Sequence, residues 1–122
     1  MKLQYPKLKV MLSIGDLGGT MFSIVAGHNQ TRNRFIASVL DFCREFNFDG
    51  IDIDWEFPVL RTGQIDDKNN LVLLLKELRQ QSNRFWKRKI RKSNKNSFLI
   101  SVAVGAPLII ASTSYVIPEI GK

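Results

Sequence analysis

The chain has 122 residues, enough for one domain with a modest core, and 44% of them are hydrophobic, which argues against a disordered protein. Its formal net charge is +7, but many of the basic residues gather between positions 87 and 95 with almost no aromatic residues among them. We interpret this run as a solvated helix end and loop and predict no nucleic-acid partner, although salt-dependent binding to a random oligonucleotide would test that alternative. The run consists of Lys87, Arg88, Lys89, Arg91, Lys92 and Lys95.

The first expected strand covers residues 9–14, KVMLSI, a short apolar run that ends at Gly15. Gly18 and Gly19 follow closely, so we expect the strand to enter a glycine-rich loop. A helix is predicted from about residue 31 to residue 46, because apolar residues recur there at three- and four-residue spacing. These apolar residues are Phe35, Val39, Phe42, Cys43 and Phe46.

The second expected strand, FDGIDIDWEF, ends at Pro58, which cannot donate a ladder hydrogen bond. A second helix begins near Asp66 or Asp67, since either residue can cap it. A third strand, SFLISVAV, is predicted over residues 97–104. Strands that alternate with helices in this way run parallel and are covered by helices, so the sequence predicts an α/β fold. The expected buried stripe of the second helix is Leu71, Leu74, Leu75 and Leu78.

Cys43 is the single cysteine, so no internal disulfide can form, and we expect a small buried side chain. The first ten residues lack the apolar centre of a signal peptide. No apolar run is long enough to cross a membrane, and we predict no membrane partner. The sequence as given therefore does not indicate a cellular compartment.

Carboxylates occupy alternate positions of the second strand. Because side chains alternate across a strand, Asp52, Asp54 and Glu56 should share one face. They rise toward the carboxyl end of the strand, where α/β folds place their active sites. Gly50 is expected to permit a local bend at the start of the strand, which leaves the facing of Asp49 open. The opposite face, which should meet the helices, consists of Ile51, Ile53 and Trp55.

Three neighbouring carboxylates cannot readily all be ionised, because each negative charge disfavours the next. We expect a coupled set that shares protons and keeps one member protonated near neutral pH, as a general acid requires. Two alternatives are acids paired with lysines or amides for structural reasons and acids that hold a divalent cation. We favour general acid chemistry and predict no metal and no cofactor, because alternate acids on one strand lack the spread of ligands that a metal site needs.

The stretch FDGIDIDWE resembles the signature of glycoside hydrolase family 18, the chitinase and chitinase-like family, with the pattern Asp-x-x-Asp-x-Asp-x-Glu. All four acidic positions match, at Asp49, Asp52, Asp54 and Glu56. The stretches KVMLSIG, DKNNLVLLLKELR and SFLISVAVGAP followed by SYVIPEI agree with the family in order. The resemblance covers nearly the whole chain and implies a (β/α)8 TIM barrel, of which residues 1–122 would supply about strands three to five with their intervening helices.

The resemblance also implies the reaction and the residue roles. Chitinases of this family cleave β-1,4-linked N-acetylglucosamine with retention, using the acetamido oxygen of the substrate as nucleophile. Glu56 would protonate the leaving oxygen and then activate water, Asp54 would orient the acetamide, and Asp52 would share a proton with Asp54. Asp49 would support the geometry of the strand together with Gly50. The residues expected to contact the sugar are Gly15 and Trp55.

Two departures from the family pattern stand out. The family loop usually reads Ser-x-Gly-Gly-Trp, whereas Asp16 and Leu17 follow Gly15 here, which puts an aromatic sugar platform in doubt. A whole barrel also needs at least roughly 200 residues. We therefore expect a fragment of a catalytic domain, which alone would self-associate or lack a cooperative unfolding transition because its sheet edges are exposed.

For the full-length protein the resemblance implies an extracellular enzyme whose partner is chitin or a chito-oligosaccharide, with no obligate protein partner. The alternative is a carbohydrate-binding chitinase-like protein that is inactive because it is truncated. Family members that act as lectins have lost the catalytic acid, but Glu56 is present in this chain.

Overall fold

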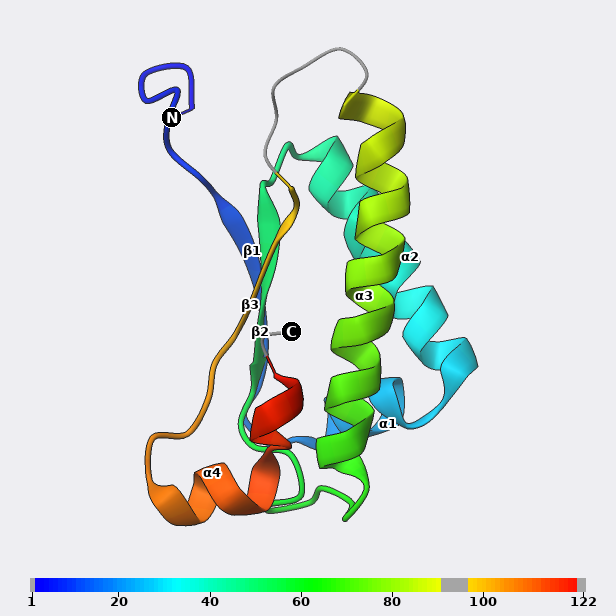
Figure 1. Ribbon diagram of the computed structural model, residues 1–122, viewed down its shortest axis with the longest axis vertical. Helices are drawn as coiled ribbons and strands as arrows, with labels where there is room; N and C mark the ends of the chain where they lie inside the picture. Colours follow the sequence, from blue (N-terminus) through cyan, green and yellow to red (C-terminus); the bar gives the residue numbers. More distant parts are fainter. Residues whose placement is uncertain (1, 91–96, 121–122) are drawn as a thin grey trace.

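The computed structural model describes residues 2–90 and 97–120 and, from residue 86 to residue 90, the backbone alone. Strands and helices alternate along the chain, and two short helical segments follow the last strand (Figure 1). The elements are β1 (Met11–Asp16), α1 (Thr20–Gly27), α2 (Asn29–Glu45), β2 (Gly50–Trp55), α3 (Asp67–Ile90), β3 (Leu99–Val102), α4 (Leu108–Ser114) and a 3-10 helix (Ile117–Glu119).

The three strands form one parallel sheet in the order β1-β2-β3, so β2 is central and the other two strands are edges. Helices α2 and α3 both lie on the same side of this sheet (Figure 1). The register places Asp52 between Ser13 on β1 and Ser101 on β3, and it pairs Asp54 with Gly15. Because paired residues of neighbouring strands face the same way, these positions form one surface of the sheet.

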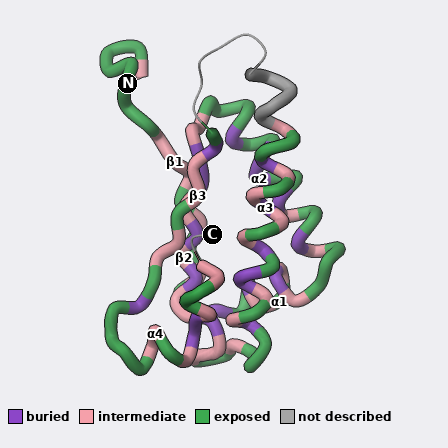
Figure 2. The backbone as a smooth tube through the Cα atoms, viewed as in Figure 1, coloured by how far each residue is buried: buried purple, intermediate pink, exposed green. Residues whose placement is uncertain are grey.

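The core lies between the sheet and the helices (Figure 2). Ile51, Ile53 and Trp55 of β2 are all 0% exposed, and the Trp55 ring stacks on Phe22 of α1 with 5.4 Å between ring centroids. Each such side chain contributes about 1.5 to 3 kcal/mol relative to an exposed one. The predicted apolar face of the central strand is confirmed.

A buried ion pair joins the three larger helices. Arg32 of α2 is only 6% exposed, and its guanidinium donates to both carboxylate oxygens of Glu77 on α3, at 3.0 and 2.9 Å. It also donates to the carbonyl oxygen of Ala26 at 2.7 Å, in the last turn of α1. Helix ends leave carbonyl groups without intrahelical partners, so this contact satisfies one of them.

The structure corrects several predicted boundaries. Helix α1 lies before the first helix that the sequence predicts, and α2 begins at Asn29 rather than near residue 31. β1 runs two residues later than expected, through Gly15, because Gly15 pairs with Asp54 in the sheet. β3 covers only residues 99–102. The expected buried stripe of α3 is confirmed at Leu71, Leu74 and Leu78, whereas Leu75 is half-buried.

The side chains of the basic run between Lys87 and Lys95 lie outside the described residues. Among the helices that the structure describes, none is both long and apolar enough to cross a bilayer.

Candidate active site

Asp52 and Asp54 lie together on the face of β2 that the helices do not cover. The hydroxyl oxygen of Ser13 is 2.8 Å from Asp54 Oδ2 and 3.2 Å from Asp52 Oδ2, so one group touches both carboxylates. Ser101 on the other side donates to Asp52 Oδ1 at 2.5 Å. The two carboxylates therefore form one cluster held by hydroxyl groups from both neighbouring strands, with hydrogen bonds that a negative charge strengthens.

Glu56 follows the last residue of β2, at the carboxyl end of the sheet. Its backbone N–H donates to the carbonyl oxygen of Asp16 at 3.3 Å, which continues the pairing of β2 with β1 by one residue. Its side chain is half-buried. Asp52 and Asp54 share one face of β2, as the sequence predicts, and the shared facing of Glu56, which follows the strand, stays a prediction.

Tyr115, which follows α4, lies within electrostatic reach of Glu56. Burial raises the pKa of the Tyr115 hydroxyl, the hydrogen bond from the Gly105 N–H (3.2 Å) lowers it, and the negative charge of Glu56 raises it again, so that the net shift is upward. The segment after β3 thus approaches the end of β2. The sequence does not predict that Tyr115 comes near Glu56, because this depends on how the chain returns to the sheet after α4.

Asp49 lies at the opposite end of β2 from Glu56 and joins neighbouring segments. Its carboxylate accepts the Val10 N–H at 2.8 Å and pairs with Lys2 at 2.7 Å, and Lys9 lies 3.8 Å away. Burial acts to raise the pKa of Asp49, but the hydrogen bonds from Lys2 and Val10 and the charges of both lysines outweigh it and hold that pKa below its ordinary value. Its backbone also bonds to Val10 and Leu99.

Gly50 permits a close approach rather than a bend. A Cβ atom at this position would lie 2.3 Å from the carbonyl oxygen of Leu99 and 2.6 Å from the Leu99 Cβ, so any side chain would push β3 away from β2. Gly50 is not among the described glycines with a positive φ angle. The need for glycine is therefore steric.

The two residues expected to contact sugar have different environments. Gly15 is exposed beside Asp54, and a Cβ atom added there would lie 3.5 Å from the Asp54 Cβ, an ordinary van der Waals contact. Trp55 is 0% exposed, packed against Phe22 on the helix side. The expectation that Trp55 contacts substrate is wrong, because alternation along β2 turns its ring away from the acids.

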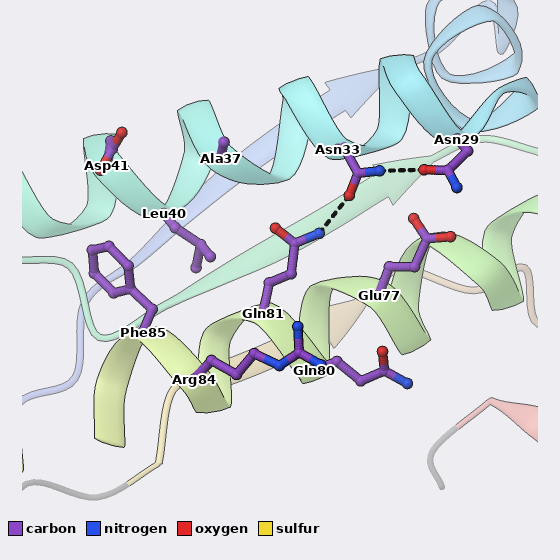
Figure 3. Close-up of a pocket in the computed structure, with 10 residues that line it drawn as sticks. All are labelled: Asn29, Asn33, Ala37, Leu40, Asp41, Glu77, Gln80, Gln81, Arg84 and Phe85. Atoms are coloured by element: carbon purple, nitrogen blue, oxygen red, sulfur yellow. Dashed lines mark hydrogen bonds between the residues drawn. The ribbon is translucent and has the colours of Figure 1, made fainter. Parts of the chain in front are cut away.

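One groove lies away from these acids. It has a volume of about 950 Å³ and runs between α2 and α3 on the outer surface, where amide side chains such as Asn33 and Gln81 bond to each other at 2.7 Å (Figure 3). None of the four signature acids lines it. The described residues contain no group of three or more His, Cys, Asp or Glu placed to hold a metal ion.

The sheet, the helices on one side and the acids on the other define an α/β protein with a carboxylate site at the carboxyl end of its central strand. The chain belongs to the glycosyl hydrolases family 18, whose family model matches residues 1–122. The family prediction made from the four acids is confirmed.

Curated relatives and solved structures that are similar to this chain agree with this family. "Probable chitinase 2" of Drosophila melanogaster is 35% identical over 124 residues, which is 100% of this chain and 23% of the relative. The Group IV chitinase of Ostrinia furnacalis, solved in complex with allosamidin, has a TM-score of 0.84 at 34% identity and covers 97% of this chain and 30% of its own. Human YKL-39, described as a pseudo-chitinase with retained chitooligosaccharide binding properties, has a TM-score of 0.82 at 28% identity, with 97% and 30% covered.

These structures confirm the α/β fold as part of a TIM barrel. The chain spans less than a third of the length of the relatives described above.

Proposed function

We propose that residues 1–122 are part of a chitinase catalytic domain and supply its catalytic acid. The observation that supports this most is the shared, helix-free face of β2, where Asp52 and Asp54 form one cluster and Glu56 follows at the carboxyl end. The substrate would be β-1,4-linked N-acetylglucosamine, since proteins similar to this chain are chitinases.

The reaction proceeds in two steps in this proposal. Glu56 gives its proton to the glycosidic oxygen while the bond from that oxygen to the anomeric carbon breaks. The acetamido oxygen of the substrate bonds to the anomeric carbon, forming a positive oxazolinium ring and making a carboxylate nucleophile unnecessary. Glu56, now ionised, takes a proton from a water molecule that attacks the same carbon, which opens the ring and restores the acid with retained configuration.

The neighbouring acids serve the acetamide. Asp54 orients the group and stabilises the positive ring, and Asp52 shares a proton with Asp54 through the cluster that Ser13 joins. This division uses electrostatic stabilisation at the place where charge develops. Gly15 has no side chain beside Asp54 that could hinder the approach of the sugar.

The activity belongs to the full-length protein in this proposal, because the chain covers 23% of its Drosophila relative. We propose secretion for that protein, chitin or a chito-oligosaccharide as its partner, and no cofactor. Binding without hydrolysis is the second candidate, supported by the likeness to YKL-39. The presence of Glu56 favours hydrolysis over binding alone.

Two measurements on the complete barrel that carries this segment test the proposal. The product first formed from a chito-oligosaccharide should be the β-anomer, observed by ¹H NMR before mutarotation. Asp54→Asn should lower turnover strongly on the N-acetylated substrate, because the acetamide loses its orienting partner. An α-anomeric product, or an Asp54→Asn barrel with unchanged turnover, would contradict the mechanism, and binding without any product would favour the second candidate.

A further inference from the structure

Two loops meet at the carboxyl end of the sheet. Residues 17–19 connect β1 to α1, and residues 57–66 connect β2 to α3 and begin directly after Glu56. Arg61 donates to the carbonyl oxygen of Leu17 at 2.6 Å, and Thr62 donates to the carbonyl oxygen of Gly18 at 2.7 Å. The Thr62 hydroxyl also lies 2.6 Å from that of Thr20. We call these three contacts the loop clasp.

The far end of the second loop is anchored as well. Asp67 is 0% exposed and accepts hydrogen bonds from the Ser23 hydroxyl at 2.9 and 3.0 Å and from the Gln64 N–H at 2.6 Å. Ser23 belongs to α1, so the same helix that follows the first loop also holds the start of α3. The loop that begins at Glu56 is thus attached to the β1–α1 segment at its middle and at its end.

The backbone of this loop is strained at two residues. Val59 and Arg61 have φ angles of 74° and 59°, in the left-handed region that side chains with a Cβ disfavour. Gly63 leaves no room for a side chain, since a Cβ atom there would lie 2.8 Å from Val59 N and 2.9 Å from Asp67 Oδ2. Strained residues persist only where surrounding contacts determine them, and the clasp supplies such contacts.

We propose that Arg61 and Thr62 are positioning residues for Glu56, which they serve by fixing the loop that follows it to the loop that follows β1. The inference rests on the proposed function. A general acid must lie within hydrogen-bond reach of the leaving oxygen, and a misplacement of about 1 Å costs on the order of 100-fold in rate. Since Glu56 directly follows the last residue of β2, a loose loop would let its carboxyl group move away from the productive position.

Apart from fixing this loop, the loop clasp contributes little to the fold. Both Arg61 and Thr62 are exposed, and neither belongs to the core. Surface residues of this kind contribute little to global stability. A purely structural role therefore predicts a small loss of stability and no change in turnover, whereas a positioning role predicts a specific loss of turnover.

The test compares Thr62→Val with Thr31→Val in the complete barrel. Valine keeps the shape of threonine but cannot donate a hydrogen bond. Thr31 is the matched control, because its hydroxyl also donates to backbone carbonyls, those of His28 at 2.8 Å and Ile24 at 3.3 Å, far from the acids in the sequence. We expect kcat of Thr62→Val to fall about tenfold with KM nearly unchanged, within the range for a misplaced group. Thr62→Ser, which retains the hydroxyl, should restore most of kcat.

Equal kcat values for Thr62→Val and Thr31→Val would overturn the inference, and so would a Thr62→Ser variant as slow as Thr62→Val. A Glu56→Gln variant measured in parallel separates the two proposals. If Glu56→Gln is inactive while Thr62→Val is unaffected, the positioning role fails and the proposed function stands. If Glu56→Gln hydrolyses at the wild-type rate, both fail.

Discussion

The two faces of β2 differ in burial and in the chemistry of their side chains. Ile51, Ile53 and Trp55 are 0% exposed and pack under the helices, whereas Asp52 and Asp54, one residue away in each case, are half-buried on the helix-free side. Alternation along the strand thus separates the side chains that stabilise the fold from those proposed to do the chemistry. Substitutions on one face should therefore change stability, and substitutions on the other should change turnover.

The largest expected effect follows from the helix-free side itself. Residues 1–122 expressed alone should self-associate or unfold without a cooperative transition, because β1 and β3 are edges and the acid face has no helix over it. Sedimentation velocity over a range of concentrations and a thermal scan would measure this. A monomer with one sharp transition would show that the covered face alone suffices for folding.

On the covered face, Ile53→Ala in the complete barrel should lower the free energy of unfolding by about 3 to 5 kcal/mol, since it leaves a cavity among buried side chains. Leu73→Ala is the control, because Leu73 is 43% exposed on α3. Urea unfolding followed by tryptophan fluorescence gives both values. If the folded Ile53→Ala barrel also lost most of its turnover, this would contradict the separation of stability and turnover between the two faces of β2.

Removal of the Arg32 guanidinium should give the next largest loss of stability. Arg32→Met should cost about 2 to 4 kcal/mol, because it leaves Glu77 and the Ala26 carbonyl without their donor. Arg34→Met, an exposed site on the same helix, should cost little. Similar unfolding midpoints for the two variants would mean that this ion pair does not join the helices.

The smallest expected effect is at Asp49 and depends on pH. Its pKa is lowered in the folded chain, so its contribution is present above its unfolded value, near 3.8, and is lost as the pH falls through the folded value. Asp49→Asn should cost about 1 kcal/mol at pH 7 and nothing once both states bind the proton. Thermal unfolding of both proteins between pH 7 and pH 2.5 would show the difference closing, and a constant difference would contradict it.

The sequence predicts the central strand well because its pattern is local. Alternation alone places Ile51 and Ile53 against helices and Asp52 and Asp54 away from them, and the structure agrees. The same rule places Trp55 on the helix side, where its ring is buried, so the separate expectation that Trp55 contacts sugar conflicts with the alternation of the strand.

What the sequence misses depends on contacts between distant segments. Ser13 and Ser101 touch the acids only because the register sets them beside Asp52, and no local pattern specifies a register between strands. The sequence does not predict helix α1, because residues 21–26 are almost all apolar and show no helical period. The loop clasp likewise joins residues 42 to 44 positions apart.

The most direct test of the central claim is the turnover of Glu56→Gln in the complete barrel, with Glu45→Gln on the exposed surface of α2 as the control. Glutamine keeps the size of the side chain but has no proton to give. Hydrolysis of a chito-oligosaccharide should fall roughly 100- to 10,000-fold or more, while circular dichroism and the unfolding midpoint stay unchanged. A correctly folded Glu56→Gln barrel that cleaves the substrate at the rate of Glu45→Gln would contradict the account.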